Sequence, residues 1–340
     1  MFKQGTKMKR LAIGIAIAIP LLVVAGTFWS QNRGGDIKQR VIIAQVSDFF
    51  LYAPIYVAKD AGFFEEQGLD VSIISTGGDE KSWAAVISGS AQFGVGDPTF
   101  VAISDQQGQR GTVIASIVNG VPFWGVTLRT DIPAITKPVQ LRGLSVATFP
   151  APSTAYTLQR EMFTRGGLEP SIRQGAFGAL IPMLKAGQAD IALELEPNVS
   201  IAVEGQGAHV VYSLANLYGD FAITGLTARP QYLRENSETT GRIVCALRKA
   251  LDFIHTKNTE TLAILKKRFP ELSGSVPLNA LRRVQSEGII PKQVAVDANA
   301  WKKAIDLRIS VGDLKSAKPM NYYVDNSFAD IADKTCGVTP

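Results

Sequence analysis

The sequence has little of the chemistry that enzymes and metal sites use. Among its 340 residues there are only two cysteines and two histidines. It contains no HExxH pair, no closely spaced cysteines and no glycine-rich loop of the Walker A type. A metal centre needs a cluster of such ligands, and covalent catalysis needs a nucleophile beside its base. We therefore expect no metal site, no cofactor and no catalytic residues.

The two cysteines, Cys245 and Cys336, are too few for a disulfide framework. On the helix predicted around residues 242–254, Cys245 falls on the side of Arg248 and Asp252, so we expect a half-exposed thiol. In an oxidising compartment such a thiol is either inert or bonded to Cys336. The sequence leaves both alternatives open.

Acidic residues are absent before Gly34, whereas five basic residues occur there. Without these five, the formal net charge of +5 becomes a balance of 30 basic and 30 acidic residues, which predicts no nucleic-acid footprint. An apolar run over residues 11–29 follows the basic residues. We predict that residues 1–33 form a signal peptide cleaved after Ala25, or an uncleaved anchor that tethers the protein through residues 11–29. Either way, the rest of the chain is expected to be periplasmic or otherwise extracytoplasmic.

Residues 89–100, GSAQFGVGDPTF, combine a helix end, a strand and a helix start. Gly89 is placed to end a helix over residues 80–88, residues 92–95 alternate as a strand does, and Asp97-Pro98-Thr99 is typical of a helix N-terminus. Residues 183–197 repeat this order of signals, with Gly187 in the place of Gly89. The repeat predicts two α/β lobes of similar plan, whose strand-to-helix turns face one cleft.

Two connections between the lobes are predicted. The first precedes a proline-rich segment holding Pro133 and Pro138, and the second leads into a return strand over residues 221–228. The expected organisation is lobe 1 over residues 34–128, lobe 2 over 129–222, and the completion of lobe 1 with C-terminal helices over 223–340. Two such connections form a hinge, because only a few residues need to change backbone angles for closure.

Polar and aromatic side chains in these turns are the candidates for ligand binding. They are Asp48, Phe49 and Tyr52; Gly78, Asp79 and Trp83; Asp97, Pro98 and Thr99; Asn119 and Trp124; Ser153, Thr154 and Tyr156; and Glu194 and Glu196. Each also has a structural interpretation. Asp79, Asp97 and Ser153 suit helix N-caps, and Trp83 suits a core position.

Residues 52–71 (YAPIYVAKDAGFFEEQGLDV) and 88–96 (SGSAQFGVG) resemble the substrate-binding proteins of ABC importers that carry the NMT1/THI5-like domain. The resemblance covers roughly residues 41–330 and continues in residues 141–147, 153–154 and 324–328. It implies the two-lobe periplasmic-binding-protein fold of type II-like plan, with a ligand cleft between the lobes and a two-strand hinge. It also implies a monomer that delivers a small molecule to a membrane permease with a separate ATPase subunit.

The ligands of this family include nitrate, sulfonates, taurine and thiamine-pyrimidine precursors. The turns of lobe 1 that face the cleft contain no Arg, only Lys81, whereas five carboxylates are candidates, and a doubly charged oxyanion usually needs guanidinium groups. We therefore expect a ligand with an aromatic or heterocyclic body and an amino group, possible stacking partners being Tyr52, Trp83, Trp124 and Tyr156. Nitrate fits least well.

Two other functions keep the same fold. One is a membrane-tethered ligand sensor, which an uncleaved segment over residues 11–29 would support. The other is an enzyme, because some eukaryotic relatives of the family synthesise the thiamine pyrimidine with a cysteine-rich motif and a histidine. This chain has only His209 and His255, and neither lies in a predicted cleft turn.

Overall fold

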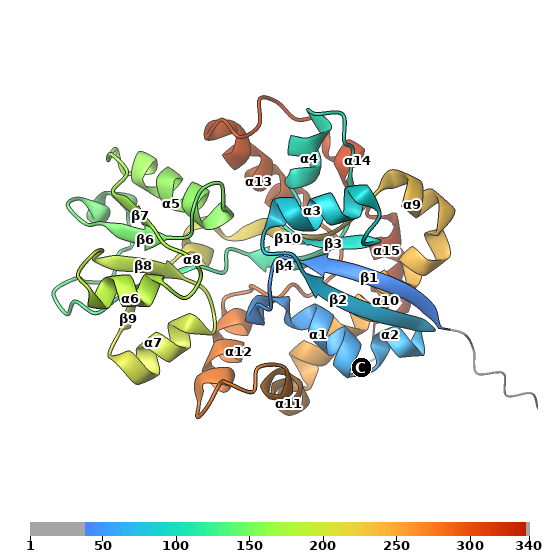
Figure 1. Ribbon diagram of the computed structural model, residues 1–340, viewed down its shortest axis with the longest axis horizontal. Coiled ribbons are helices and arrows are strands. Elements are labelled where there is room, and N and C mark those ends of the chain that lie inside the picture. The colour runs from blue at the N-terminus through green and yellow to red at the C-terminus, as the bar shows by residue number, and fades with distance from the viewer. Residues whose placement is uncertain (1–37, 338–340) are drawn as a thin grey trace, which may run out of the picture. The chain divides into compact units, whose positions relative to one another are not determined.

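Two five-stranded sheets form the framework of the protein (Figure 1). The structure is a computed structural model that describes residues 38–337, so the predicted signal or anchor over residues 1–33 lies outside the described residues. The first sheet has the order β2-β1-β3-β10-β4, and its strands are β1 (Gln39–Gln45), β2 (Leu69–Ser75), β3 (Phe93–Gly96), β4 (Thr112–Gly120) and β10 (Asp220–Ala228). Strands β1, β2 and β3 are parallel, and β10 runs antiparallel to β3 and β4.

The second sheet has the order β7-β6-β8-β5-β9. Its strands are β5 (Trp124–Thr127), β6 (Val146–Thr148), β7 (Ile172–Gln174), β8 (Ile191–Glu194) and β9 (His209–Ser213). Again three strands are parallel, and a fourth, β5, runs antiparallel to its two neighbours. The two sheets therefore share one plan, which confirms the predicted two-lobe α/β fold.

The chain passes twice between the sheets. It leaves the first sheet after Gly120 at the end of β4 and enters the second at Trp124 in β5. It returns from β9 through the short helix α8 (Leu214–Tyr218) into β10, which confirms the predicted return strand in the first sheet. We call the parts built on the first and second sheets lobe 1 and lobe 2.

The repeated helix, strand and turn unit is present in both lobes. In lobe 1, helix α3 (Asp79–Ser88) ends at Gly89, whose φ of 83° is in the left-handed region, and β3 and α4 (Phe100–Asp105) follow. In lobe 2, α6 (Leu180–Lys185) is followed by Gly187 with φ 67°, then by β8 and α7 (Asn198–Gln206). Glycine adopts this conformation without the steric penalty that a Cβ atom brings, so both turns were predictable from the sequence.

Helices cover both sheets (Figure 1). The others are α1 (Ala53–Asp60), α2 (Phe63–Glu66), α5 (Thr154–Arg165), α9 (Pro230–Glu235), α10 (Ser237–Thr256), α11 (Asn258–Arg268), α12 (Val276–Ser286), α13 (Ala298–Ser310), α14 (Met320–Tyr323) and α15 (Ser327–Thr335), with 3-10 turns at Phe50–Tyr52 and Pro138–Leu141. Helix α13 packs on β10, and α12 contacts both α7 of lobe 2 and α11. The C-terminal helices thus reach the region where the lobes meet.

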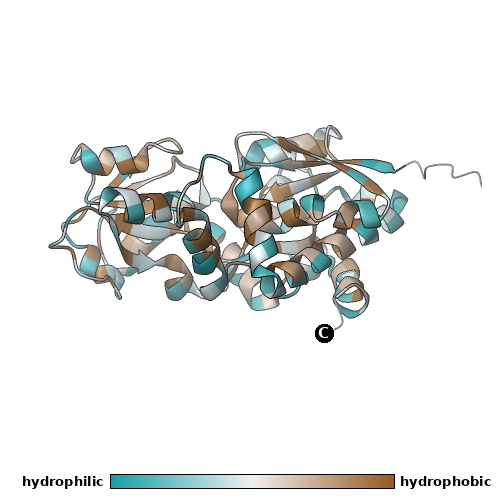
Figure 2. Ribbon diagram, turned by 90° about the horizontal axis from the view of Figure 1, so that it is seen from below, coloured by the Kyte–Doolittle hydropathy of each residue, from teal (hydrophilic) through white to brown (hydrophobic). Residues whose placement is uncertain are grey.

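Hydrophobic residues dominate the strands, whereas the helices carry both kinds of residue along their length (Figure 2). This is the pattern of strands buried between layers of amphipathic helices. None of the helices within residues 38–337 has the length and apolar character needed to cross a membrane.

A disulfide joins Cys245 in α10 to Cys336 at the end of α15, with 5.4 Å between the two Cα atoms. This confirms the bonded alternative. The expectation of a half-exposed Cys245 is wrong, because the residue is only 9% exposed. Helix α15 packs along α10 and covers the side of the helix that the hydrophobic pattern alone assigns to solvent.

Candidate functional site

A cavity of about 470 Å³ lies where the turns of the two lobes meet. Lobe 1 contributes Val46, Ser47, Phe49, Leu51, Tyr52, Gly77, Gly78, Asp79, Glu80, Asp97, Phe100, Ile223 and Thr224; the first connection contributes Pro122 and Phe123; and lobe 2 contributes residues 149–155, Phe177 and Leu195. Small-molecule sites in proteins have this size and this mainly apolar lining. The cavity is therefore the candidate ligand site.

Aromatic rings from both lobes meet at this cavity. The centroid of Phe49 in lobe 1 lies 5.3 Å from that of Phe177 in lobe 2, and 5.5 Å from that of Tyr52. Phe149 lies 6.0 Å from Phe177 and 6.4 Å from Phe123. At these distances and tilts the rings attract one another, and a planar ligand could stack on them. The aromatic cluster thus joins the two lobes across the site.

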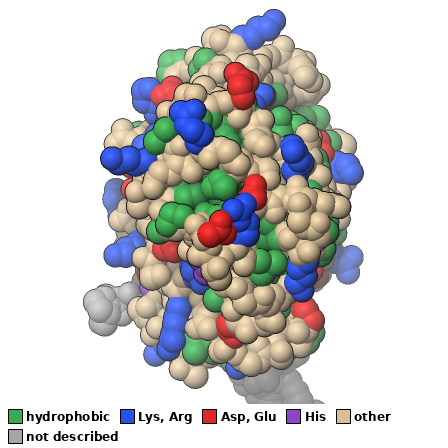
Figure 3. Space-filling model, turned by 90° about the vertical axis from the view of Figure 1, so that its left-hand side faces the viewer, with side chains coloured by type: hydrophobic (Ala, Val, Ile, Leu, Met, Phe, Trp, Pro, Cys, Tyr) green, Lys and Arg blue, Asp and Glu red, His purple; other side chains and the backbone are tan. Residues whose placement is uncertain are grey.

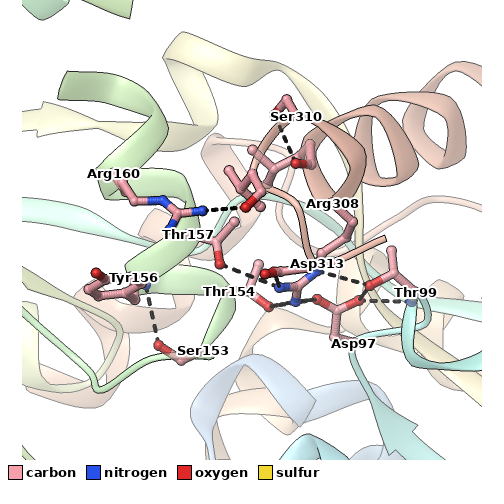
Figure 4. Close-up of polar contacts among 12 residues, drawn as sticks. Asp97, Thr99, Ser153, Thr154, Tyr156, Thr157, Arg160, Arg308, Ser310 and Asp313 are labelled. Atoms are coloured by element: carbon pink, nitrogen blue, oxygen red, sulfur yellow. Dashed lines mark hydrogen bonds and ion pairs between the residues drawn. The ribbon is translucent and has the colours of Figure 1, made fainter. Parts of the chain in front are cut away.

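Asp97 anchors a buried polar network beside the cavity (Figure 4). Its Oδ1 accepts hydrogen bonds from the backbone N–H and the hydroxyl of Thr99, at 2.8 and 2.5 Å. Its Oδ2 accepts from Arg308 Nη2 at 2.6 Å and from Thr154 Oγ1 at 2.6 Å. Because Thr154 belongs to α5 of lobe 2, the network links the two lobes.

Arg308 is almost fully buried, with 1% of its surface exposed. It also donates to Asp313 at 2.8 Å and to Thr157 at 3.4 Å, so its guanidinium group is held by two carboxylates and by hydroxyl groups of both lobes. Burial alone would lower the pKa of Arg308, but the charges of Asp97 and Asp313 and the hydrogen bonds to them together raise it. The guanidinium group of Arg308 therefore stays protonated in this buried pair.

Asp79 is a carboxylate that lines the cavity and, like Glu80, has no cation bonded to it among the described residues. Its Oδ1 accepts a hydrogen bond from the backbone N–H of Asp97 at 2.7 Å. Withdrawal from water, followed by the negative charge of Asp97, raises the pKa of Asp79 to about 7. The group therefore changes charge close to neutral pH.

Seven of the predicted site residues line the cavity: Phe49, Tyr52, Gly78, Asp79, Asp97, Ser153 and Thr154. Nine others do not: Asp48, Trp83, Pro98, Thr99, Asn119, Trp124, Tyr156, Glu194 and Glu196. Trp83 is 5% exposed and donates its indole N–H to Ser104 at 2.8 Å, as its core interpretation implies. The indole of Trp124 donates to the carboxylate of Glu287 at 2.9 Å.

Glu194 and Glu196 lie in the interior of lobe 2 rather than at the cavity. Burial raises the pKa of Glu194 to about 7, and its Oε1 has no hydrogen-bond partner among the described residues. Burial also raises the pKa of Glu196, although Arg283 bonds to it at 2.7 Å. Strand β8 ends at Glu194, so Glu196 lies beyond the strand.

The predicted helix caps have different outcomes. Ser153 caps α5, since its hydroxyl accepts from the backbone N–H of Tyr156 at 3.3 Å. Asp79 is not the N-cap of α3; Gly78 is, and the Asp79 side chain bonds to Asp97 instead. Asp97 accepts the N–H of Thr99 but lies two residues too early, because the N-cap of α4 is Thr99 itself.

Three of the five candidate carboxylates have an arginine partner from outside the turns. Arg308 pairs with Asp97, Arg283 with Glu196, and Arg268 with Asp48. All three arginines come from C-terminal helices or their ends, more than 80 residues away from their partners along the chain. The sequence of the turns alone therefore could not show that distant arginines neutralise these three carboxylates.

Several lining residues were not predicted from the sequence. Phe149 directly precedes a turn with Pro150 and Pro152, and Phe177 is an exposed aromatic residue next to Gly178 in a loop. An aromatic side chain in a short polar or glycine-containing loop is a usable signal, the same one that selected Phe49. Arg308 offers no such signal, because it lies within a helix 211 residues from Asp97.

The two histidines lie away from the cavity. His209 Nε2 is 3.4 Å from the carbonyl oxygen of Ile132, and His255 Nε2 is 3.0 Å from that of Pro291. Within residues 38–337, no group of three or more His, Cys, Asp or Glu side chains could hold a metal ion. On the face of lobe 2 shown in Figure 3, Lys and Arg side chains are scattered among acidic and apolar ones rather than gathered in one patch.

Truncating Phe177 should weaken binding of an aromatic ligand without affecting folding. Its side chain is 51% exposed, yet it contacts Phe49 and Phe149 beside the cavity. For Phe177→Ala we expect a loss of affinity of about threefold to tenfold, the value of one aromatic contact. Titration calorimetry measures it, with Ile331→Ala as a control, since Ile331 is 62% exposed on the distant α15. Equal affinities for the two variants would contradict the prediction.

Comparisons with known proteins agree on the fold. The family model described as NMT1/THI5 like matches residues 50–261. The chain is 21% identical over 297 residues to "Putative binding protein YtlA" of Bacillus subtilis (strain 168), covering 86% of this chain and 89% of that protein. Among solved structures, it superposes on the periplasmic aliphatic sulphonate binding protein SsuA from Escherichia coli with a TM-score of 0.69, 15% identity and coverage of 85% and 92%. The periplasmic nitrate-binding protein NrtA from Synechocystis PCC 6803 gives a TM-score of 0.71, 14% identity and coverage of 88% and 90%.

Proposed function

Because the chain belongs to the NMT1/THI5-like family, we propose that it is an extracytoplasmic solute-binding protein that captures a small organic molecule between its lobes and delivers it to an ABC importer. The observation that supports this most strongly is the cavity of about 470 Å³ built by strand-to-helix turns of both lobes. In α/β folds, ligands bind where such turns meet. The names of SsuA and NrtA describe periplasmic binding proteins with the same architecture.

The proposed mechanism is capture by closure. A ligand in the cavity contacts Tyr52 and Asp79 of lobe 1 together with Phe149 and Thr154 of lobe 2. It therefore binds the closed form of the protein more tightly than the open form. The ratio of these two affinities sets how far the ligand shifts the population toward the closed form. The closed form then docks on a permease whose ATPase is a separate polypeptide.

The basic and apolar pattern of residues 1–33 supports export, either with cleavage or with retention as an anchor. If the segment is retained as an anchor, the protein could also act as a ligand sensor at the membrane. N-terminal sequencing of the exported protein distinguishes the two arrangements. We propose binding rather than catalysis, since the carboxylate that accepts from the hydroxyl of Thr154 at the cavity, Asp97, is already paired with Arg308.

A thermal-shift panel tests the proposed function. The panel contains taurine, alkanesulfonates, aromatic sulfonates, nitrate, aminopyrimidines, and flavins with their precursors. A ligand that binds only the native state stabilises it by about 2.7 kcal/mol at 100 times its Kd, so we expect one chemical group to raise the Tm by several degrees. No shift with any compound, together with no small molecule retained from a cell extract by mass spectrometry, would contradict solute binding.

A further inference from the structure

The charge of the cavity wall is one-sided. Three carboxylates line the cavity: Asp79, Glu80 and Asp97. No Lys or Arg is among the described residues that line it. Asp97 is already neutralised by Arg308. Negative charge therefore remains at the cavity on Asp79, which is half-buried, and on Glu80, which is exposed, and this charge is unfavourable for an anionic ligand.

Asp79 has the geometry of a binding group. One carboxylate oxygen, Oδ1, is fixed by the backbone N–H of Asp97 at 2.7 Å, and it packs so closely on β3 that a Cβ at Gly96 would lie 2.5 Å from it. The other oxygen has no hydrogen-bond partner within residues 38–337, while the residue lines the cavity. A carboxylate held in one orientation with one unused oxygen is a preorganised acceptor.

The rest of the wall suits an apolar or aromatic body. Phe49, Phe123, Phe149 and Phe177 line the cavity with Leu195 and Ile223. Aromatic faces also attract cations, so the same rings that hold a planar body favour a positively charged group near it. The carboxylate and the rings thus select for the same kind of molecule.

From these contacts we infer that Asp79 determines the charge of the ligand: the protein binds an aromatic or apolar compound with a protonated amine, whose N–H group donates to the unpaired oxygen of Asp79. This inference rests on the proposed function and specifies its ligand. Sulfonates and nitrate are disfavoured, because they would face Asp79 and Glu80 without a guanidinium group to bind them.

Binding of such an amine should depend on pH. The pKa of Asp79 is raised to about 7, since burial and then Asp97 and Glu80 raise it, whereas the Asp97 N–H and Arg308 lower it. Tyr52 is the other titratable group near this carboxylate, and its pKa lies well above 10. The amine binds the ionised carboxylate, so its affinity should fall about tenfold from pH 8 to pH 6 and about a further tenfold to pH 5.

Three compounds that differ only in their charged group test this inference: 2-phenylethylamine, 2-phenylethanol and 2-phenylethanesulfonate. We expect calorimetry at pH 8 to give an affinity for the amine at least about tenfold higher than for the alcohol or the sulfonate, with concentrations up to about 10 mM. In Asp79→Asn the preference should disappear, because the amide keeps the acceptor for the Asp97 N–H but carries no charge.

Two controls separate charge selection from folding. Glu169→Gln removes one negative charge from an exposed position outside the cavity and should bind like the wild type. Asp79→Asn should keep or raise its Tm at pH 8, since a group whose pKa is raised by folding destabilises the native state when it is ionised.

The outcomes distinguish this inference from the proposed function. Tighter binding of the sulfonate or the alcohol, or an unchanged amine affinity in Asp79→Asn, overturns charge selection but leaves solute binding supported. If none of the three compounds binds while another compound of the thermal-shift panel does, the inference again fails alone. If no compound of either set binds, both fail.

Discussion

Replacing Arg308 by methionine should lower the free energy of unfolding by about 3–5 kcal/mol, the usual effect of removing one partner from a buried ion pair. The change leaves the carboxylate of Asp97, which is 7% exposed, without its cation. It also removes the donors that reach Thr154 and Thr157 of lobe 2. Methionine preserves most of the apolar volume of the side chain, so the loss reports mainly on charge.

Urea denaturation of the purified variants measures this effect. Asp313→Asn is the matched control, because Asp313 is the more exposed partner of Arg308 and its removal should matter by less than about 1 kcal/mol. The double variant Asp97→Asn with Arg308→Met should be less destabilised than the two single losses added together, since it leaves no unpaired charge. A decrease of less than about 1 kcal/mol in the free energy of unfolding for Arg308→Met would show that the Asp97–Arg308 network does not stabilise the contact between the lobes.

Removing the disulfide should destabilise the protein by about 2–5 kcal/mol. The bond closes a loop with a sequence separation of 91 and ties α15 to α10. Without it the unfolded chain gains conformational freedom that the bonded chain lacks. Cys245→Ser and Cys336→Ser should therefore have similar effects, and the double variant should add little to either. Clearly additive losses would show that the side chains contribute through packing rather than through the bond.

Local signals allowed much of the fold to be predicted. Gly89 and Gly187 end their helices in the left-handed conformation, and Ser153 caps α5, because the relevant contacts lie within a few residues. The similar plan of the lobes followed from the repetition of these signals. Strand order could not be read from the same signals, since the antiparallel strands β5 and β10 each lie in a different sheet from the strand that precedes them in sequence.

The candidate site was only partly predictable, for a related reason. Asp97 was found from its turn, but its partner Arg308 lies on a helix 211 residues away, and no local pattern links the two. Asp79 was predicted both as a ligand-binding candidate and as a helix N-cap; it lines the cavity, but its side chain bonds to the backbone N–H of Asp97 and does not cap α3. Interactions between distant segments decide which carboxylates are neutralised, and so decide the charge of the site.

The central claim is that the ligand lies in the cavity between the lobes, and a crystal structure of the protein with the compound that gives the largest thermal shift tests it most directly. We expect density for the compound in contact with Phe49 and Asp79 of lobe 1 and with Phe149 of lobe 2. Density for the compound only at another position, with the cavity free of it, would contradict the account.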